Sequence, residues 1–103
     1  MNKYRSHNCV ELRESDVGNK VILSGWLHRK RDHGNLLFVD LRDHFGLTQC
    51  VIENNSKYFK LLENLKPESV ISISGKVVIR EKGTENKDLK TGKIEVNIES
   101  INT

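Results

Sequence analysis

The sequence has little cysteine and no long apolar segment, and both absences exclude classes of protein. Its two cysteines, Cys9 and Cys50, lie far apart and form no CxxC motif. Small secreted domains usually carry more cysteines, so both are predicted to be reduced thiols in a cytosolic protein. No apolar stretch approaches the ~20 residues of a membrane span, and "MNKYRSHNC" lacks the apolar centre of a signal peptide. We therefore expect a cytoplasmic protein with no membrane partner.

The common motifs of catalysis and metal binding are also absent. The sequence has no GxSxG, HExxH, P-loop or GxGxxG motif. Its 4 histidines have no ligand-like spacing with one another or with the cysteines, so no metal site is expected. Asp40 and Asp43 should point to opposite faces of a strand, and we interpret them as solvated or turn-forming acids. Residues 1–103 are therefore not expected to catalyse a reaction.

The length and charge of the chain fit one small domain. It has 103 residues, of which 36% are hydrophobic and 30% charged, enough for a single core with a polar surface. Lysine and arginine total 17 against 14 acids, a net charge of +3. Because this excess is small, the clustering of the cations matters more than their number. We expect one domain over residues 1–103, with a lead-in at 1–18 and the start of a linker at 100–103.

Short β-branched runs, separated by glycines and polar clusters, predict five strands. They are expected at residues 21–30, 35–43, 47–53, 69–81 and 94–100. The first and fourth contain Gly25 and Gly75, which suit sharp bends at the corners of a small barrel. Residues 11–20 are predicted to form a turn or short helical lead-in that Gly18 closes.

One segment, between the third and fourth strands, has helical spacing. Its apolar residues recur at i, i+3, i+4 and i+7 on one face: Tyr58, Leu61, Leu62 and Leu65. Asn55 or Ser56 is predicted to cap the helix, and Pro67 to end it. The order of three strands, a helix and two strands is that of the OB-fold, a five-stranded Greek-key barrel. Such barrels usually bind oligonucleotides or oligosaccharides, although a fold alone does not determine function.

Phe38 is the residue that most favours nucleic-acid binding. It shares its strand parity with Asp40 and Arg42, so its ring is expected on a polar outer surface. The other parity of this strand is apolar: Leu37, Val39 and Leu41. Exposed aromatic rings on an OB barrel stack unpaired bases. The alternative is that a bulge turns Phe38 into the core.

The basic run "HRKRDHG" follows at the end of the first strand. Arg29, Lys30 and Arg31 are expected to stand beside Phe38, where the phosphates of a bound strand would pass. Arginine can also bond a base edge in a bidentate manner, which lysine cannot do. Asp32 is expected to orient one of the arginines. The alternative is a solvated end of a strand.

Three further polar residues are candidates for contacts with bases. Gln49 has an amide that both donates and accepts, although the parity of its strand is ambiguous. Arg80 adds a cation just before the polar loop at 82–93. Glu95 can accept hydrogen bonds from the N–H groups of guanine, although a residue at such a position is more often simply the outward residue of an edge strand.

The segments "GWLHRKRDHGNLLFVDLRDHFGLTQCV" and "LKTGKIEV" resemble the N-terminal anticodon-binding domain of bacterial-type aspartyl-tRNA synthetases. The elements RxRDHG, FxDLRD and TGxIEV carry this resemblance, which covers essentially the whole chain. It implies that the partner is tRNA and that Phe38 stacks on the middle anticodon base. It further implies that Gln49, Arg31 and Arg80 bond base edges, and that Glu95 reads the first base, a guanine or its modified form.

The same resemblance implies roles for four more positions. Arg29 matches a basic residue that contacts the RNA backbone or loop. Asn86 and Thr84 lie in the loop between the fourth and fifth strands, which closes over the anticodon. Members that charge only aspartate tRNA often have leucine in place of His33 and asparagine in place of Thr84. The residues present here favour an enzyme that also aspartylates asparagine tRNA.

Enzymes of this family continue into a catalytic domain that binds ATP, aspartate and magnesium. The resemblance implies that residues 1–103 bind an anticodon stem-loop, need no cofactor and form no aspartyl-tRNA. The parent would be a homodimeric class II aspartate–tRNA ligase. Two other classes stay open: a binder of single-stranded nucleic acid that tolerates any sequence, and a protein-interaction module.

Overall fold

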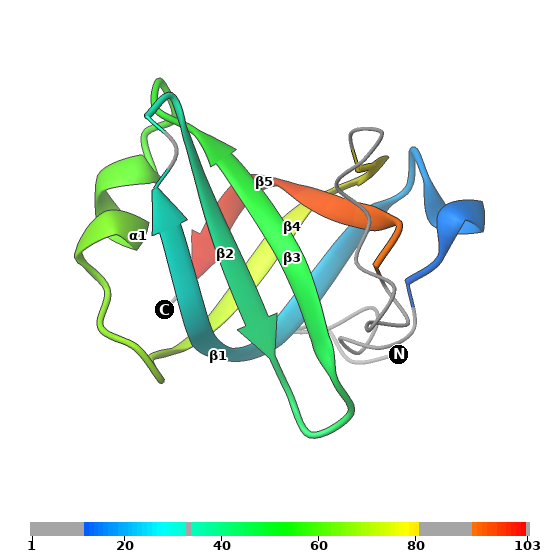
Figure 1. Cartoon of the computed structure of the whole chain (residues 1–103), viewed down its shortest axis with the longest axis horizontal. Coiled ribbons are helices and arrows are strands. Elements are labelled where there is room, and N and C mark those ends of the chain that lie inside the picture. Colours follow the sequence, from blue (N-terminus) through cyan, green and yellow to red (C-terminus); the bar gives the residue numbers. More distant parts are fainter. Residues whose placement is uncertain (1–11, 33, 81–91, 103) are drawn as a thin grey trace.

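The computed structural model describes residues 12–32, 34–80 and 92–102. Over these ranges, strands form a closed barrel in the order β1-β2-β3-β5-β4 (Figure 1). In chain order they are β1 (Lys20–Asp32), β2 (Leu36–Arg42), β3 (Leu47–Glu53), β4 (Val70–Ile79) and β5 (Ile94–Asn102). The β3–β5 pairing is parallel, and the other pairings are antiparallel. The helix α1 (Phe59–Asn64) lies between β3 and β4, so the predicted OB-fold is confirmed.

Two glycines let the long strands bend where the barrel closes. A Cβ atom on Gly25 would collide with the carbonyl oxygen of Arg42, and one on Gly75 with the carbonyl oxygen of Asn97. Gly75 also stands at a register shift between β4 and β5. Because β1 bends, it pairs with β4 through its first half and with β2 through its second half. The predicted role of both glycines at barrel corners is confirmed.

The core is built from the strand positions whose parity the sequence predicts to be apolar. These buried residues include Leu37, Val39, Leu41, Ile94, Val96 and Ile98, together with Leu62 of α1. Each fully buried aliphatic side chain contributes roughly 1.5–3 kcal/mol to folding before entropy is counted. The alternation leaves the other parity of each strand on the outer wall, where a partner can reach it.

The predicted apolar face of the helix is wrong at one position. Leu61 is 39% exposed, whereas Phe59 packs beside the core together with Tyr58 and Leu65. The helix is only 6 residues long and begins at Phe59. In this helix Leu62 faces the core and Leu61 faces outward. Neither predicted cap is in place, because Tyr58 occupies the N-cap position without a side-chain cap. The Ser56 hydroxyl accepts instead from the Tyr58 N–H in the preceding turn, at 3.2 Å.

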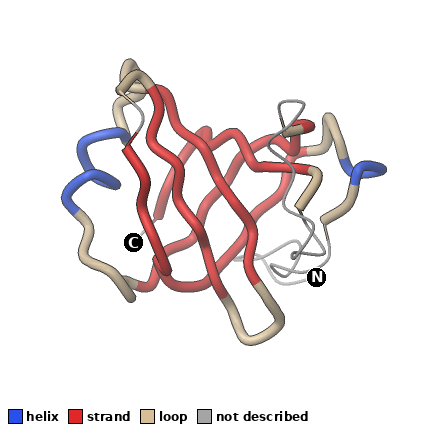
Figure 2. Tube along the Cα trace, viewed as in Figure 1, coloured by secondary structure: helices blue, strands red, loops and turns tan. Residues whose placement is uncertain are grey.

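The ends of the described chain differ slightly from prediction. The lead-in contains the short 3-10 helix η1 (Glu14–Asp16) before Gly18, as predicted, and Figure 2 shows it on the opposite side of the barrel from α1. Residues 100–102, expected to begin a linker, extend β5 and pair with β4. Most of the loop predicted at 82–93 lies outside the described residues. Within the described ranges, no helix is long and apolar enough to cross a membrane.

Candidate nucleic-acid interface

A register shift in β1 decides which charges of the basic run face outward. Leu27 is buried and pairs with Leu41, but after the shift Arg29 pairs with Asp40 and Arg31 with Phe38. His28 is the residue left over at this irregularity. Cross-strand partners in an antiparallel pair share a face. Both arginines therefore lie on the outer wall, on the same side as Phe38.

Lys30 lies between the two arginines and points to the other side. Its ammonium group donates to the backbone carbonyls of Leu62 at 3.2 Å, Glu63 at 2.7 Å and Leu65 at 2.7 Å. An ammonium group has three N–H donors, so these carbonyls satisfy all of them. The expectation that Lys30 would join the arginines on a phosphate path is wrong, because the lysine ties the end of α1 to the barrel.

Arg31 is held on the outer wall by two neighbours. Its Nη2 atom donates to Asp40 Oδ1 at 3.0 Å and to Gln49 Oε1 at 2.6 Å. The Arg31 side chain is 40% exposed, whereas the Asp40 side chain is 12% exposed. Asp40, expected to be solvated or part of a turn, is therefore a buried partner of a guanidinium group. The charge-assisted bonds fix the direction of a side chain that would otherwise be mobile.

Gln49 connects this pair to the fifth strand. It faces Asp40 across the β2–β3 ladder and is buried, which resolves the ambiguity of its parity in favour of the outer wall. Its Nε2 atom donates to Glu95 Oε1 at 2.9 Å. Glu95 is half-buried and lies outward from the core residues Ile94 and Val96. Side chains from four strands thus form one continuous row, which we call the outer row: Arg31, Asp40, Gln49 and Glu95.

Phe38 lies beside this outer row and outside the core. It is half-buried and does not belong to the cluster of core residues, so the alternative of a bulge that buries it is excluded. The guanidinium carbon of Arg31 lies 6.0 Å from the centre of its ring. A ring next to a guanidinium group on an open surface is an arrangement that suits the stacking of a base.

Arg80 closes the other side of the site. Its backbone N–H donates to Lys93 O at 3.0 Å, and its Nε atom donates to Ile94 O at 3.1 Å. Burial lowers the pKa of the Arg80 guanidinium, while the charges of Glu95 and Asp40 act in the opposite direction. The group keeps its charge, because the guanidinium group of arginine does not deprotonate in proteins. Burial makes this cation more rigid than one on a solvated loop.

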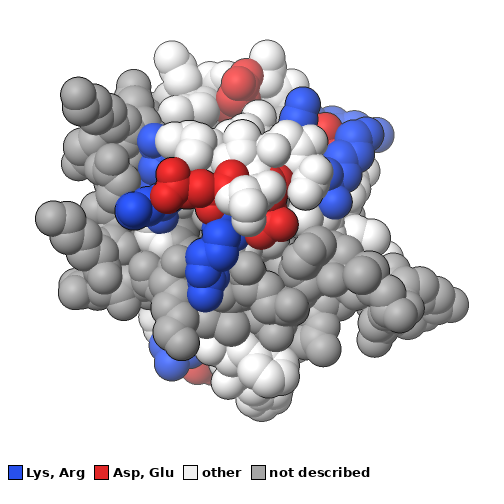
Figure 3. Space-filling model, turned by 90° about the vertical axis from the view of Figure 1, so that its right-hand side faces the viewer, with Lys and Arg blue, Asp and Glu red and all other residues white. Residues whose placement is uncertain are grey.

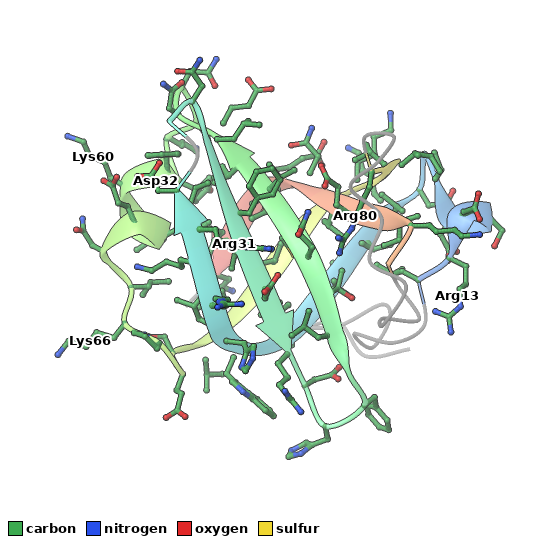
Figure 4. The ribbon with its side chains drawn as sticks, in the orientation of Figure 1. Arg13, Arg31, Asp32, Lys60, Lys66 and Arg80 are labelled. Carbon is green, nitrogen blue, oxygen red and sulfur yellow. The ribbon has the colours of Figure 1, made fainter. Side chains whose placement is uncertain are left out.

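These side chains surround a polar cleft of about 300 Å³. It is lined by His28, Arg29, Arg31, Asp40, Leu47, Gln49 and Arg80. Figure 4 shows Arg31 and Arg80 over the middle of the barrel, whereas Lys60 and Lys66 lie by α1 at its end. On the face seen in Figure 3, basic and acidic side chains stand next to each other and not in separate areas. The cleft itself combines three arginines with the acid Asp40 and the amide of Gln49, a mixture that favours hydrogen-bond recognition over simple attraction to phosphate.

Several predicted site residues have other positions or lie outside the structure. Asp32 does not orient an arginine in the described structure, because its Oδ1 atom accepts the Gly34 N–H at 2.9 Å and closes a turn. Asp43 is buried and accepts the N–H groups of Phe45 at 2.8 Å and Gly46 at 3.1 Å, so its turn-forming role is confirmed. Three other predicted residues lie outside the described ranges: His33, Thr84 and Asn86.

Cys50 is the cysteine that the structure describes, and it is not part of a metal site there. Among the described residues, no group of His, Cys, Asp and Glu is arranged to hold a metal ion. Cys50 is a free, buried thiol, as its predicted reduced state requires. Burial raises the pKa of this thiol far above its ordinary value, and the charges of Asp40 and Glu95 raise it further. A buried neutral thiol is a poor nucleophile.

Residues 21–103 match the tRNA anticodon family, described as an OB-fold nucleic acid binding domain. The chain belongs to this family. It is 59% identical over 101 residues to an aspartate–tRNA(Asp/Asn) ligase from Pelagibacter ubique, covering 98% of this chain and 17% of that protein. A protein of the same name from Bradyrhizobium diazoefficiens is 56% identical, with the same coverage. The family that the sequence motifs suggested is thereby confirmed.

Solved structures support the same placement in this OB-fold family. An asparaginyl-tRNA synthetase from Pyrococcus horikoshii aligns with a TM-score of 0.79 and 27% identity, covering 93% of this chain and 22% of that one. The chain thus spans 17% of the length of the first curated relatives that it matches. The cleft of this OB-fold domain also contains residues that the sequence analysis did not predict, namely His28, Leu47 and Asp40. Asp40 could have been predicted, because it shares its strand parity with Phe38.

Proposed function

We propose that this chain is the anticodon-binding domain of an aspartate–tRNA ligase. The observation that carries the proposal is the outer row beside Phe38, in a chain 59% identical to a protein of that name. A half-buried ring, two outward arginines and an amide linked to an acid offer stacking, charge and base-edge contacts in and beside one cleft. A solvated strand end would not order its charges in this way.

The proposal gives each described site residue a role that suits its position. Phe38 stacks an unpaired base, which is the middle base of the anticodon in our proposal. Arg29, exposed at the rim, attracts phosphate, while Arg31 and Arg80 donate to base edges from fixed positions. Gln49 and Glu95 present an amide and a carboxylate side by side, which together suit the donors and acceptors of a guanine edge. Asn86 and Thr84 would complete the site from the loop that follows β4.

The activity of the parent protein forms the second part of the proposal. We infer that the whole enzyme uses ATP and magnesium in a separate catalytic domain, acts as a homodimer in the cytoplasm and contains residues 1–103 as one domain. The curated relatives carry names that include both tRNA(Asp) and tRNA(Asn). Together with His33 and Thr84, this supports a parent that aspartylates both tRNAs. Aminoacylation of the two purified tRNAs by the full-length protein tests that inference.

Binding of a stem-loop tests the role of this domain directly. The probe is an RNA stem-loop with the anticodon GUC, which pairs with an aspartate codon, compared with one whose anticodon is scrambled. We expect tighter binding of GUC and a loss of roughly 5- to 150-fold in affinity for Phe38→Ala, since stacking contributes about 1–3 kcal/mol. Phe45→Ala is the matched control, because Phe45 is 57% exposed on the β2–β3 turn and does not line the cleft.

The result that overturns the proposal is equal affinity for GUC and scrambled stem-loops. The barrel would then be a binder that tolerates any sequence, relying on charge and stacking alone. An equal loss for Phe38→Ala and Phe45→Ala would contradict the stacking role. An absence of any RNA binding at low salt would instead favour a protein-interaction module.

A further inference from the structure

A buried acid on the outer wall is the feature that the proposed contacts leave unexplained. Asp40 is 9% exposed and lines a cleft with three arginines, where phosphate or a base would approach. A carboxylate repels phosphate, and its burial is unfavourable unless hydrogen bonds satisfy it. Its Oδ1 atom accepts a hydrogen bond from Arg31 Nη2, at 3.0 Å. Asp40 therefore acts on its surroundings through its contact with Arg31.

Arg31 uses one nitrogen atom of its guanidinium group for its hydrogen bonds to Asp40 and Gln49. A guanidinium group can face a carboxylate with two parallel N–H bonds, which is the stronger arrangement. Here a single atom, Nη2, serves both Asp40 and Gln49, and the buried Nε atom has no hydrogen-bond partner among the described residues. The second bond to Asp40 is thus replaced by a 2.6 Å bond to Gln49 Oε1. This geometry places the guanidinium group between Asp40 and Gln49.

Arg31 in turn selects one of two orientations of the Gln49 amide. The amide oxygen faces the Arg31 donor, and the amide nitrogen faces the Glu95 acceptor at 2.9 Å. A flipped amide would set its N–H groups against the guanidinium donor and its oxygen against the carboxylate, giving two repulsive contacts. The cation on one side and the acid on the other therefore fix which edge of Gln49 donates and which accepts.

We propose that Asp40 is a positioning residue that fixes the base preference of this domain through Arg31 and Gln49. This inference rests on the proposed function. Without Asp40, the partly exposed Arg31 side chain turns toward solvent, and Gln49 loses the contact that selects its orientation. An amide that can flip accepts or donates at the same place and so discriminates less between bases. Asp40 itself does not need to touch RNA.

The test is Asp40→Asn, which keeps the size of the side chain and removes its charge. The affinities of this variant are measured for the GUC stem-loop and for three stem-loops with one anticodon base changed. We expect the largest ratio of affinities to fall about tenfold, which corresponds to about 1.4 kcal/mol, because the amide keeps an acceptor for Arg31 but loses the charge that strengthens the bond. In a Gln49→Ala background, Asp40→Asn is expected to cause no further fall, because both act through the same amide.

Asp43→Asn is the matched control. Asp43 is also a buried acid, but its carboxylate holds backbone N–H groups of the β2–β3 turn. We expect this variant to be less stable toward heat and to keep the wild-type ratio of affinities. A purely structural role for Asp40 predicts that both variants behave in this way.

The outcomes separate this inference from the proposed function. If the wild-type chain does not discriminate among the stem-loops, the proposed function fails before Asp40 is considered. If the wild type discriminates and a folded Asp40→Asn variant retains the full ratio of affinities, the positioning role is refuted. It is also refuted if the losses caused by Asp40→Asn and by Gln49→Ala simply add. If Asp40→Asn does not fold, the unmodified protein decides: slow solvent exchange of the Arg31 and Gln49 side-chain protons supports the role, and fast exchange overturns it.

Discussion

Replacing Lys30 by methionine should weaken the barrel without weakening its binding of RNA. The Lys30→Met substitution keeps the apolar stem of the side chain and removes the ammonium group. That group donates to three carbonyls at the end of α1, two through partly buried bonds and one through an exposed bond. Hydrogen bonds to a charged group contribute about 1.5–3 kcal/mol when buried, and solvent reduces this value.

We therefore expect the free energy of unfolding to fall by about 2 kcal/mol, equivalent to a melting temperature lower by roughly 8–16 °C for a domain of this size. Urea denaturation followed by circular dichroism measures the change. Lys60→Met is the matched control, because Lys60 is exposed on α1, and it should change the free energy by less than about 0.5 kcal/mol. The reasoning is refuted if Lys30→Met is as stable as the wild type but binds the GUC stem-loop less tightly with a reduced salt dependence.

Three other substitutions test separate parts of the structure. Arg29→Met should leave stability unchanged and reduce the slope of log affinity against log salt by about 0.7, as expected for one phosphate contact to a single strand; an unchanged slope would remove Arg29 from the interface. Gly75→Ala should lower the free energy of unfolding by about 1–3 kcal/mol, because its Cβ would meet the Asn97 carbonyl, and an unchanged urea midpoint would contradict that close approach. Burial raises the pKa of Cys50, so the thiol stays neutral in the folded state while the unfolded chain ionises above about pH 8.5; stability should then fall by up to about 1.4 kcal/mol per pH unit up to about pH 10. Cys50→Ala should lack this component in pH-dependent urea melts, and equal slopes for both proteins would argue against it.

The fold was predictable because its signals are local. Alternating aliphatic residues such as Leu37, Val39 and Leu41 specify an inner face within one strand, and Gly25 and Gly75 mark the bends. The helix was predicted at the right place with a partly wrong face. A helix of 6 residues is too short for periodicity alone to distinguish Phe59 from Leu61 as the packed residue.

The arrangement of the site was less predictable because it depends on contacts between distant segments. Phe38 follows from strand parity alone, and the structure places it on the outer wall as expected. Alternation along the strand puts Lys30 on the opposite face from Arg29 and Arg31, but which face is outward depends on the shift at His28, which leaves no mark in composition or charge. Gln49 and Glu95 are 46 positions apart, and no local pattern specifies that they meet. Hence the sequence identified several residues of the site but not their bonds to one another.

The outer row also connects β3 and β5, the two strands whose pairing closes the barrel. These strands meet over only two residue pairs, Cys50 with Val96 and Val51 with Asn97, whereas the other neighbours pair along longer ladders. The Gln49–Glu95 bond lies next to this narrow seam and joins the same two strands. A ligand that binds both side chains would therefore also hold β3 and β5 together. Recognition of the ligand and closure of the barrel would then depend on the same pair of residues.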